Sequence, residues 1–562
     1  MNDWIARFEP NADPIIMETG NCRFDHDHLH VDNGQCSVII DALILNQKAL
    51  FEQHHTNDFL QLVLSMRHDK PKDYFNDFRG PFTGLFYDKR TRQAEVFTNQ
   101  TGDSAVFYYL SDQVQVFSSN FSLLVDYLKE NHQSLHFDEK AAHWMLTFGY
   151  LIDDATYIQE IKQLTAGKVL FLNDGRWLVE RYHRFLSDPI TITEDEALER
   201  MDTLFRQAVR RCFDKDLEYG HHEHLADMSA GMDSRMVNCV AKALGYGRIT
   251  NLSYSQTGSE EERLSKQASA WFGNAMMFEP LDDHAFVFDL EALVRSGYGI
   301  YLYSGITGGA RLLSKIDFSR FGVEHTGLLG DVVVGGTYMR GSETEINVDA
   351  LRLSHLLPLR YDFNPERFES QELYGLYTRG FKGIMASWFI RKKFTFALSP
   401  FLDVDFLSFC FSLPSVMRRD HQLYWRWVER FYPEALAVPT SRKRVPHTLP
   451  QQGFDFSNRA FHKALKVGRK LMFRLGLTDS RVRSDSSMNP YEYWYDTDPK
   501  MREFFDNYYR DHICLLNEHS LIKQEVDCLY NKGSVWDRLM ALTVLGAYSY
   551  FVPGKAAINF LV

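Results

Sequence analysis

The sequence predicts two domains of different class: an α+β domain dominated by antiparallel strands over residues 1–187, and an α/β domain rich in helices over residues 188–562. Three observations predict this division. Short strand patterns joined by turn residues fill the first part, a helix-capping signal follows an irregular stretch near residue 190, and helix and strand patterns alternate beyond it. Such alternation favours a parallel sheet covered by helices.

Strands in the first part are predicted where short apolar runs end in turn residues. Asn33-Gly34 separates two such runs and is a hairpin signal, because Asn-Gly readily adopts the positive φ angles of a type I′ turn. Further strands are expected at 84–88, 95–98, 106–110 and 114–118, with helices near 45–66 and 137–147.

The second part opens with a capping box. Thr193 and Glu196 precede an apolar periodicity typical of a helix, which we expect to run to about Cys212. Strands are then predicted at 224–228, 249–254 and 275–281, and helices at 236–244 and from Ser259 to Gly273. Beyond residue 285 the chain is expected to be mostly helical and rich in aromatic residues.

Composition narrows the class of protein. Lys and Arg number 62 against 74 Asp and Glu, a formal net charge of −12, whereas nucleic-acid binding needs a dense positive surface. Seven cysteines without a C-x-x-C pair indicate a reducing, cytoplasmic setting. The start lacks the pattern of a secretory signal, and the apolar run 394–413 contains Asp403 and Asp405, so we expect no membrane span.

The most specific signal lies between a predicted strand and a predicted helix. Residues 229–234, the first motif, are Ser-Ala-Gly-Met-Asp-Ser. Small residues let backbone N–H groups approach an anion, the helix N-terminus adds partial positive charge, and two serine hydroxyls add donors. A carboxylate at Asp233 suits such a loop if it binds Mg²⁺ that bridges phosphate oxygens. The motif therefore predicts a site for a metal nucleotide.

Two other nucleotide fingerprints are missing from the sequence. No segment has the Walker A spacing, and Gly297-Tyr-Gly299 lacks the third glycine of a dinucleotide motif. The first motif instead resembles the S-G-G-x-D-S pyrophosphate loop of the ATP pyrophosphatases, with Ala230 in place of one glycine. An ordinary strand-to-helix turn is the alternative interpretation.

Further motifs, in the same order along nearly the whole chain, resemble the asparagine synthetase-like superfamily. Those in the first part are Phe78-Arg-Gly80-Pro-Phe82, Tyr87-Asp88, Gly102, Phe107-Tyr-Tyr109 and Ser118-Ser119. Those in the second part are the second motif (residues 327–336, similar to G-E-G-x-D-E-x-x-G-G), the P-F-L-D of residues 400–403, and residues 439–444, similar to the stretch that bears a catalytic lysine.

The resemblance implies a glutaminase-like, Ntn-type antiparallel β-sandwich followed by a PP-loop ATP pyrophosphatase domain. It implies a ligase that adenylates a carboxylate with ATP, releases pyrophosphate and passes the acyl group to an amine or ammonia. Asp233 and Asp331 would bind Mg²⁺, and Lys443, with Arg442 or Arg444 beside it, would stabilise the transition state. The residues implied in nucleotide binding are Met228, Ser229, Ala230, Gly231, Met232, Asp233, Ser234, Leu252, Tyr254, Ser255, Gly327, Leu328 and Gly330.

The first part departs from the glutamine-hydrolysing members of the family. Those members begin with a nucleophilic Cys after removal of Met1, whereas residue 2 here is Asn2, whose amide cannot attack a carbonyl. Asn99 also stands where glutaminases carry an Asp. We therefore predict a glutaminase-like domain without glutaminase activity, as in the β-lactam synthetases.

The second part departs from the family in its acceptor half. Leu328 and Val332 replace two Glu of the second motif, and Phe396 replaces the Glu before P-F-L-D. The proton acceptor for the amine is therefore not where relatives keep it. Leu328 and Phe396 suggest a larger or more apolar carboxylate, on a small molecule or a peptide. The acid, the amine donor and the formation of a homodimer stay open.

One acidic run and one basic run in the second part each have two possible interpretations. Glu260 to Glu262 form either further metal ligands or a solvated first helical turn. Arg391 to Lys393 form either a contact to an anionic substrate or a solvated helix end.

Two classes of function also stay open. Retention of Ser229, Asp233, Ser234, Asp331 and Lys443 favours the AMP-forming ligase. Loss of the family's three Glu favours a nucleotide-binding pseudoenzyme with a regulatory or scaffolding role. Sulfur or lysidine chemistry on tRNA is disfavoured by the acidic charge and the lack of a Cys pair.

Overall fold

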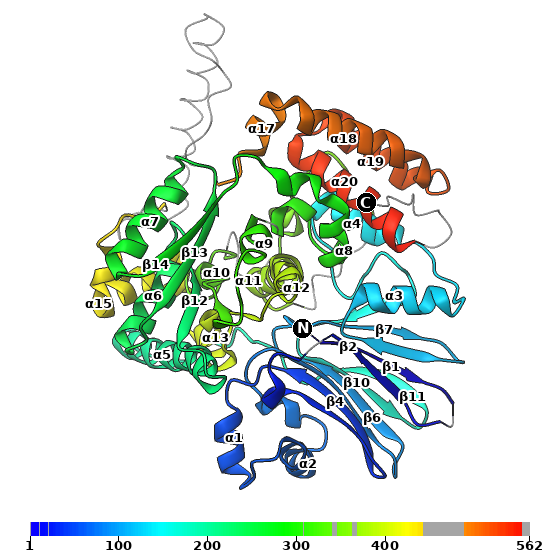
Figure 1. Cartoon of the computed structure of the whole chain (residues 1–562), viewed down its shortest axis with the longest axis horizontal. Coiled ribbons are helices and arrows are strands. Elements are labelled where there is room, and N and C mark those ends of the chain that lie inside the picture. The colour runs from blue at the N-terminus through cyan, green and yellow to red at the C-terminus, as the bar shows by residue number, and fades with distance from the viewer. Residues whose placement is uncertain are drawn as a thin grey trace, which may run out of the picture.

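The computed structural model describes residues 2–10, 12–20, 22–306, 308–339, 346–361, 368–441 and 488–552. This part of the chain forms three sheets. Two of them lie together in the amino-terminal part, and the third lies beside them with helices around it (Figure 1). Helices from the carboxyl-terminal end gather over α4 of the amino-terminal part (Figure 1).

The two amino-terminal sheets are antiparallel and pack face to face. Their strand orders are β2-β1-β8-β7-β9 and β11-β10-β6-β5-β4-β3. Trp4 and Phe117 of the first sheet pack against Leu85 and Val96 of the second, which confirms an antiparallel sandwich. The strands are β1 Asp3–Phe8, β2 Ile15–Thr19, β3 Leu29–Asp32, β4 Cys36–Ala42, β5 Phe82–Asp88, β6 Gln93–Thr98, β7 Val106–Leu110, β8 Gln115–Ser118, β9 Ile161–Leu164, β10 Lys168–Asn173 and β11 Arg176–Arg181.

The predicted hairpin at Asn33-Gly34 is confirmed, but its turn type is wrong. The backbone N–H of Asn33 donates to the carbonyl of Cys36 at 3.0 Å and closes β3 on β4. Neither Asn33 nor Gly34 has a positive φ. The Asn33 side chain instead accepts hydrogen bonds from the backbone of Gln35 at 2.8 Å and Cys36 at 3.0 Å, an Asx turn that makes positive φ angles unnecessary.

The helices of the first part cover the outer faces of the sandwich. The predicted region 45–66 is divided into α1, Gln47–Gln53, and α2, Phe59–Asp69, and they pack on the outer face of β4. Helix α3, Phe121–Glu130, and α4, Glu139–Phe148, pack toward the carboxyl-terminal helices.

The third sheet is parallel, as predicted, and its chain order reverses at β12. The order is β14-β13-β12-β15-β16, so that β12 and β15 lie side by side although helices and strands separate them in sequence. Loops that leave such a pair run in opposite directions and open a crevice, which is where open α/β sheets bind ligands. The strands are β12 Glu223–Asp227, β13 Ile249–Ser255, β14 Ala275–Pro280, β15 Phe321–His325 and β16 Ala397–Leu398.

Helices cover both faces of the parallel sheet. The predicted capping box begins α5, and this helix, Glu194–Glu218, extends beyond the predicted end at Cys212. It packs with α6, Asp233–Ala243, and α7, Glu260–Phe272, on the face that carries Ala226. Leu225, the preceding residue of β12, packs on the other face against Leu312 of α9, Gly308–Leu313.

Carboxyl-terminal helices link the two parts of the chain. Helix α4 packs on α19 and α20, where His143 and Glu525 form a buried pair at 2.8 Å. The strands of the two antiparallel sheets precede residue 187 in the sequence, and those of the parallel sheet follow it. The domain boundary at residue 187 itself stays a prediction. Other helices of the second part are α8 Leu290–Ser296, α10 Gly330–Val333, α11 Gln371–Gly375, the π-helix Leu376–Gly383, α12 Ser387–Arg391, α13 Val404–Ser412, α14 Ser415–Arg418, α15 Gln422–Phe431, α17 Tyr491–Thr497, α18 Pro499–His512, α19 Ser520–Lys532 and α20 Val535–Phe551.

In the described ranges, no helix combines the length and the apolar character that crossing a bilayer requires.

Removing the N-cap side chain of α5 tests the assignment of Thr193 as the residue that begins this helix. Thr193→Ala deletes the hydroxyl that accepts from the backbone N–H of Glu196, and we expect a loss of about 1 kcal/mol in the free energy of unfolding. Urea unfolding followed by tryptophan fluorescence measures this loss. Thr191→Ala, on the exposed stretch before the helix, is the control, and equal stabilities of the two variants would contradict the assignment.

Candidate functional site

The two motifs meet at the point where the strand order reverses. The first motif follows β12, and the second follows β15, which pairs with β12. The backbone N–H of Met228 donates to the carbonyl of Leu252 at 2.8 Å, so the end of β13 also lies against the first motif. The structure therefore gathers the residues implied in nucleotide binding at one edge of the sheet.

Glycines allow the two motifs to touch. A Cβ on Gly327 would lie 2.3 Å from the backbone nitrogen of Ser234, and one on Gly330 would lie 2.7 Å from Cγ of Asp233. Leu329, between these glycines, has a φ of +64°, a backbone conformation that side chains rarely adopt. Strain of this kind, commonly about 1–3 kcal/mol, persists where surrounding contacts enforce it.

The two predicted metal ligands are neighbours in this contact. Asp233 accepts from the backbone N–H of Asp331 at 3.0 Å through Oδ2, and from the hydroxyl of Tyr424 at 2.7 Å through Oδ1. Asp331 accepts from the hydroxyl of Thr337 at 2.9 Å. Ionised carboxylates are oxygen ligands of the kind that Mg²⁺ takes. Mg²⁺ is commonly bound by one or two carboxylates together with substrate phosphates, and this pair fits that pattern.

Hydrogen bonds within the first motif hold it in shape. The hydroxyl of Ser234 accepts a hydrogen bond from the backbone N–H of Ser229 at 2.9 Å. The hydroxyl of Ser229 accepts one from the backbone N–H of Gly231 at 3.2 Å. The backbone N–H of Ala230 donates to Glu261 at 2.9 Å. Burial raises the pKa of this carboxyl group. Glu261 is therefore part of the site, and the interpretation of a solvated helical turn is wrong for this residue.

A buried ionic cluster lies beside the first motif. Arg391 contacts Glu324 of β15 at 2.7 Å, Asp227 of β12 at 3.4 Å and the hydroxyl of Tyr254 at 3.3 Å. Burial raises the pKa of Glu324 to about 8, although the charge of Arg391 opposes this. The interpretation of a solvated helix end is therefore wrong for Arg391. Sequence patterns missed this cluster because its members come from four separate elements.

A second buried cluster fixes the strands below the motifs. Oδ2 of Asp216 lies 2.7 Å from His224 of β12 and 2.8 Å from His325 of β15, and Oδ1 accepts from the backbone of Val323 at 2.8 Å. Burial raises the pKa of Asp216, but the charges and hydrogen bonds of His325 and His224 outweigh it and hold this pKa below its ordinary value. Within the described ranges, these three form the one group of three or more His, Cys, Asp or Glu side chains whose ligand atoms lie close enough together to hold a metal ion.

Three expectations on the acceptor half have different outcomes. Phe396 is 6% exposed and packs against Phe24, so its position gives no support to the larger or more apolar carboxylate that the sequence suggests. Leu328 is partly exposed beside the contact of the two motifs. Arg442, Lys443 and Arg444 lie outside the described residues. Ser441, which precedes them, donates its backbone N–H to the carbonyl of Ala230 at 3.0 Å, so the chain enters this segment at the first motif.

The two asparagines from which the sequence predicts a lack of glutaminase activity are buried. Asn2 is 6% exposed and Asn99 is 2% exposed. The side-chain amide of Asn99 donates to Thr101 at 2.9 Å and to Asp103. Burial raises the pKa of Asp103 to about 7. Asn99 therefore stabilises its own loop.

Comparisons with known proteins do not identify a family. No protein-family model and no curated protein matches the chain. Among solved structures, glutamine phosphoribosylpyrophosphate amidotransferase from B. subtilis, complexed with ADP and GMP, aligns at a TM-score of 0.22 and 9% identity, over 49% of this chain and 74% of that one. A structure titled as the allosteric regulatory enzyme of purine biosynthesis aligns at 0.23 and 8% identity, over the same shares. TM-scores this low establish neither fold nor activity.

A single added methyl group tests the contact between the motifs. Gly327→Ala places a Cβ against backbone atoms that cannot rotate away, and we expect a loss of about 1–3 kcal/mol in stability. Gly247→Ala is the control, because no atom lies within 4 Å of its added Cβ. Thermal unfolding of both variants measures the difference, and an unchanged Tm for Gly327→Ala would contradict the contact.

Proposed function

We propose that the chain is an AMP-forming carbon–nitrogen ligase, which activates a substrate carboxylate with ATP and transfers the acyl group to an amine or to ammonia. The observation that carries this proposal is the contact of the two motifs at the reversal of strand order, with Asp233 and Asp331 side by side. Open α/β sheets bind ligands at such a point. Two separate phosphate-side loops, each with one carboxylate, suit a triphosphate better than a monophosphate.

The reaction we propose has two steps. A carboxylate oxygen of the substrate attacks the α-phosphorus of ATP, the bond to the bridging oxygen breaks, and pyrophosphate leaves. The amine then attacks the acyl carbon, AMP leaves with the bonding electrons, and the amine loses a proton. Mg²⁺, when bound by Asp233 and Asp331, neutralises charge on the phosphate oxygens.

Protein groups of the site have separate roles in this proposal. The first motif binds the leaving pyrophosphate, and the end of β13, with Leu252, Tyr254 and Ser255, borders the nucleoside. Lys443, or Arg442 or Arg444 beside it, supplies positive charge where negative charge grows. Ser441 supports this role, because its bond to Ala230 brings the chain to the first motif immediately before these cations.

The nitrogen source in this proposal is not glutamine. Asn2 provides no nucleophile, and the Asn99 amide is committed to Thr101 and Asp103. Free ammonia or an amine of a substrate supplies the nitrogen instead.

One observation favours a second candidate, a nucleotide-binding pseudoenzyme. Glu261 occupies the backbone N–H of Ala230, which a phosphate would otherwise accept from. Nucleotide binding therefore requires that the Glu261 carboxylate moves away from this N–H group, or that Glu261 and the phosphate bind the same cation. A pseudoenzyme would bind ATP and never exchange pyrophosphate into it.

An ATP–pyrophosphate exchange screen over carboxylic acids separates the two candidates. We expect one class of acid to support exchange, and Asp233→Asn to abolish it, because the amide cannot bind Mg²⁺ as a carboxylate does. Asp188→Asn, exposed between the two parts, is the control and should exchange at the normal rate. Full exchange by Asp233→Asn would remove this residue from the site.

A second variant tests the cation assigned from the sequence. Lys443→Ala should lower kcat by about two to three powers of ten and leave the Kd for ATP within about threefold, since the charge acts mainly in the transition state. Single-turnover kinetics and equilibrium dialysis measure the two effects. Normal activity would transfer the role to Arg442 or Arg444.

A further inference from the structure

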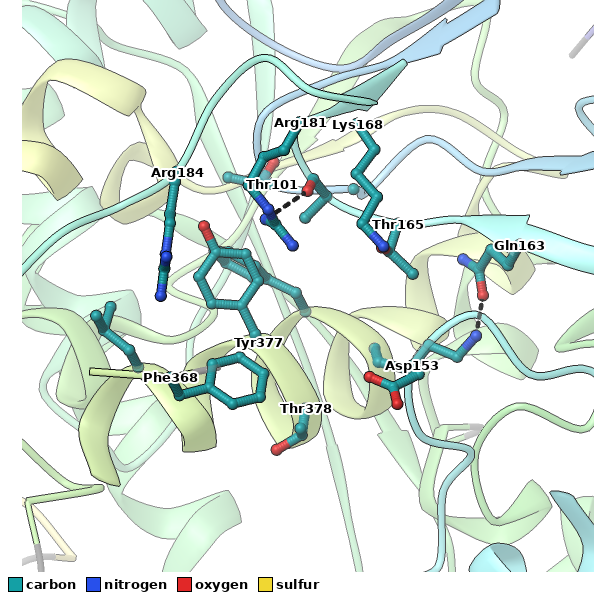
Figure 2. A pocket seen from close by; sticks show the side chains of 15 residues that line it. Thr101, Asp153, Gln163, Thr165, Lys168, Arg181, Arg184, Phe368, Tyr377 and Thr378 are labelled. Carbon is teal, nitrogen blue, oxygen red and sulfur yellow. Dashed lines mark hydrogen bonds between the residues drawn. The ribbon is translucent and has the colours of Figure 1, made fainter. Parts of the chain in front are cut away.

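A cavity of about 260 Å³ lies between the antiparallel sandwich and the helices of the second part (Figure 2). Its upper wall in the view comes from β10, β11 and the stretch that follows β11, and its lower wall from the π-helix. It shares no lining residue with the two motifs of the proposed nucleotide site.

The wall of this cavity is strongly positive. Among the described residues that line it, Lys168, Arg181, Arg184 and Lys382 are cations, and Asp153 is the one carboxylate. The chain as a whole has a net charge of −12, so this gathering of positive charge is against the general composition. Figure 2 shows Lys168, Arg181 and Arg184 extending from the upper wall toward the π-helix.

Lys382 is a buried cation whose hydrogen-bond acceptors are neutral. It is 6% exposed, and its ammonium group donates to the carbonyl of Ala155 at 3.1 Å and to the side-chain oxygen of Gln163. A buried charge is costly unless an opposite charge compensates it. An anion in the cavity would offset that cost.

Aromatic side chains form the remainder of the wall. Phe368, Tyr377 and Phe381 line the cavity, and the guanidinium of Arg181 lies 5.4 Å from the centre of the Tyr377 ring. Such stacking orients the guanidinium, which also donates to the carbonyl of Ala166 at 3.4 Å. The π-helix that carries Tyr377, Phe381 and Lys382 is a rare form that is frequent at functional sites.

We propose that this cavity binds a small organic polyanion, whose phosphate or carboxylate groups contact Arg181, Lys168 and Lys382 while its carbon skeleton lies against Phe368 and Tyr377. Guanidinium and ammonium groups are the donors that both kinds of acid group prefer. The volume suits a compact metabolite of a few carbon atoms better than a nucleotide. Because the walls come from both parts of the chain, the ligand also stabilises their contact. This proposal is independent of the ligase activity.

Binding of two probes to the full chain tests the site and separates the two acid groups. Citrate carries carboxylates alone, and 3-phosphoglycerate carries one phosphate and one carboxylate. We expect saturable binding of at least one probe, at one site per chain, by titration calorimetry at constant ionic strength, with a rise in Tm as the site fills. Tighter binding of citrate identifies a polycarboxylate ligand, and tighter binding of 3-phosphoglycerate identifies an organic phosphate.

Variants place the bound probe in this cavity. The double variant Lys168→Gln and Arg181→Gln should weaken binding by about tenfold or more, because charge-assisted hydrogen bonds are lost. Arg184→Gln alone, at an exposed position where it removes only an exposed ion pair with Glu369, should weaken binding less. Arg176→Gln, exposed on the same strand β11, is the matched control. Asp233→Asn should bind the probe normally, which separates this site from the nucleotide site.

Two results would overturn the proposal. One is the lack of saturable binding of either probe to the unaltered chain. The other is equal affinity of the unaltered chain and the double variant, with the double variant shown by circular dichroism to be folded.

Discussion

The contact between two loops at the centre of a parallel sheet is the constraint on which the rest of the site depends. Strand order places β15 beside β12, and glycines at 327 and 330 let the second motif touch the first. The backbone of Asp331 then donates to the carboxylate of Asp233. With side chains at these glycines the loops would stand apart, and the two carboxylates would no longer be neighbours.

Two buried ionic clusters, one on each face of the sheet, support the strands from which the two motifs extend. Asp216 of α5 joins His224 of β12 to His325 of β15 on one face of the sheet, and Arg391 joins Asp227 to Glu324 on the other. Both clusters bridge the same two strands. Removing one member of such a buried network leaves a charge uncompensated and is strongly destabilising. The edge from which both motifs extend is therefore held from both sides.

Buried ionic and apolar contacts bind the antiparallel sandwich to the second part. Lys215 of α5 and Asp27 form an ion pair at 2.8 Å with both side chains buried. Arg79 reaches Asp405 at 2.9 Å, and helices of both parts share one core. Without the sandwich Lys215 would lose this buried partner, so the second part depends on the sandwich for its stability. The cationic cavity lies along this same contact.

Local signals in the sequence predicted the parts of the fold that local forces decide. The capping box at Thr193, the strand-to-helix position of the first motif and the helix end at Gly273 are confirmed because each depends on residues a few positions apart. The contacts of Tyr424 with Asp233 and of Phe396 with Phe24 depend on distant segments meeting, and no periodicity encodes them. The Asn33 turn differs from expectation because its side chain offered the backbone another acceptor.

The bond of ATP that is broken tests the central claim most directly. Phosphorus NMR of the purified chain with Mg²⁺, ATP, an amine and the acid that supports pyrophosphate exchange reports the products without labels. We expect AMP and pyrophosphate in equal amounts, from cleavage between the α- and β-phosphorus atoms. Formation of ADP and inorganic phosphate would contradict the account.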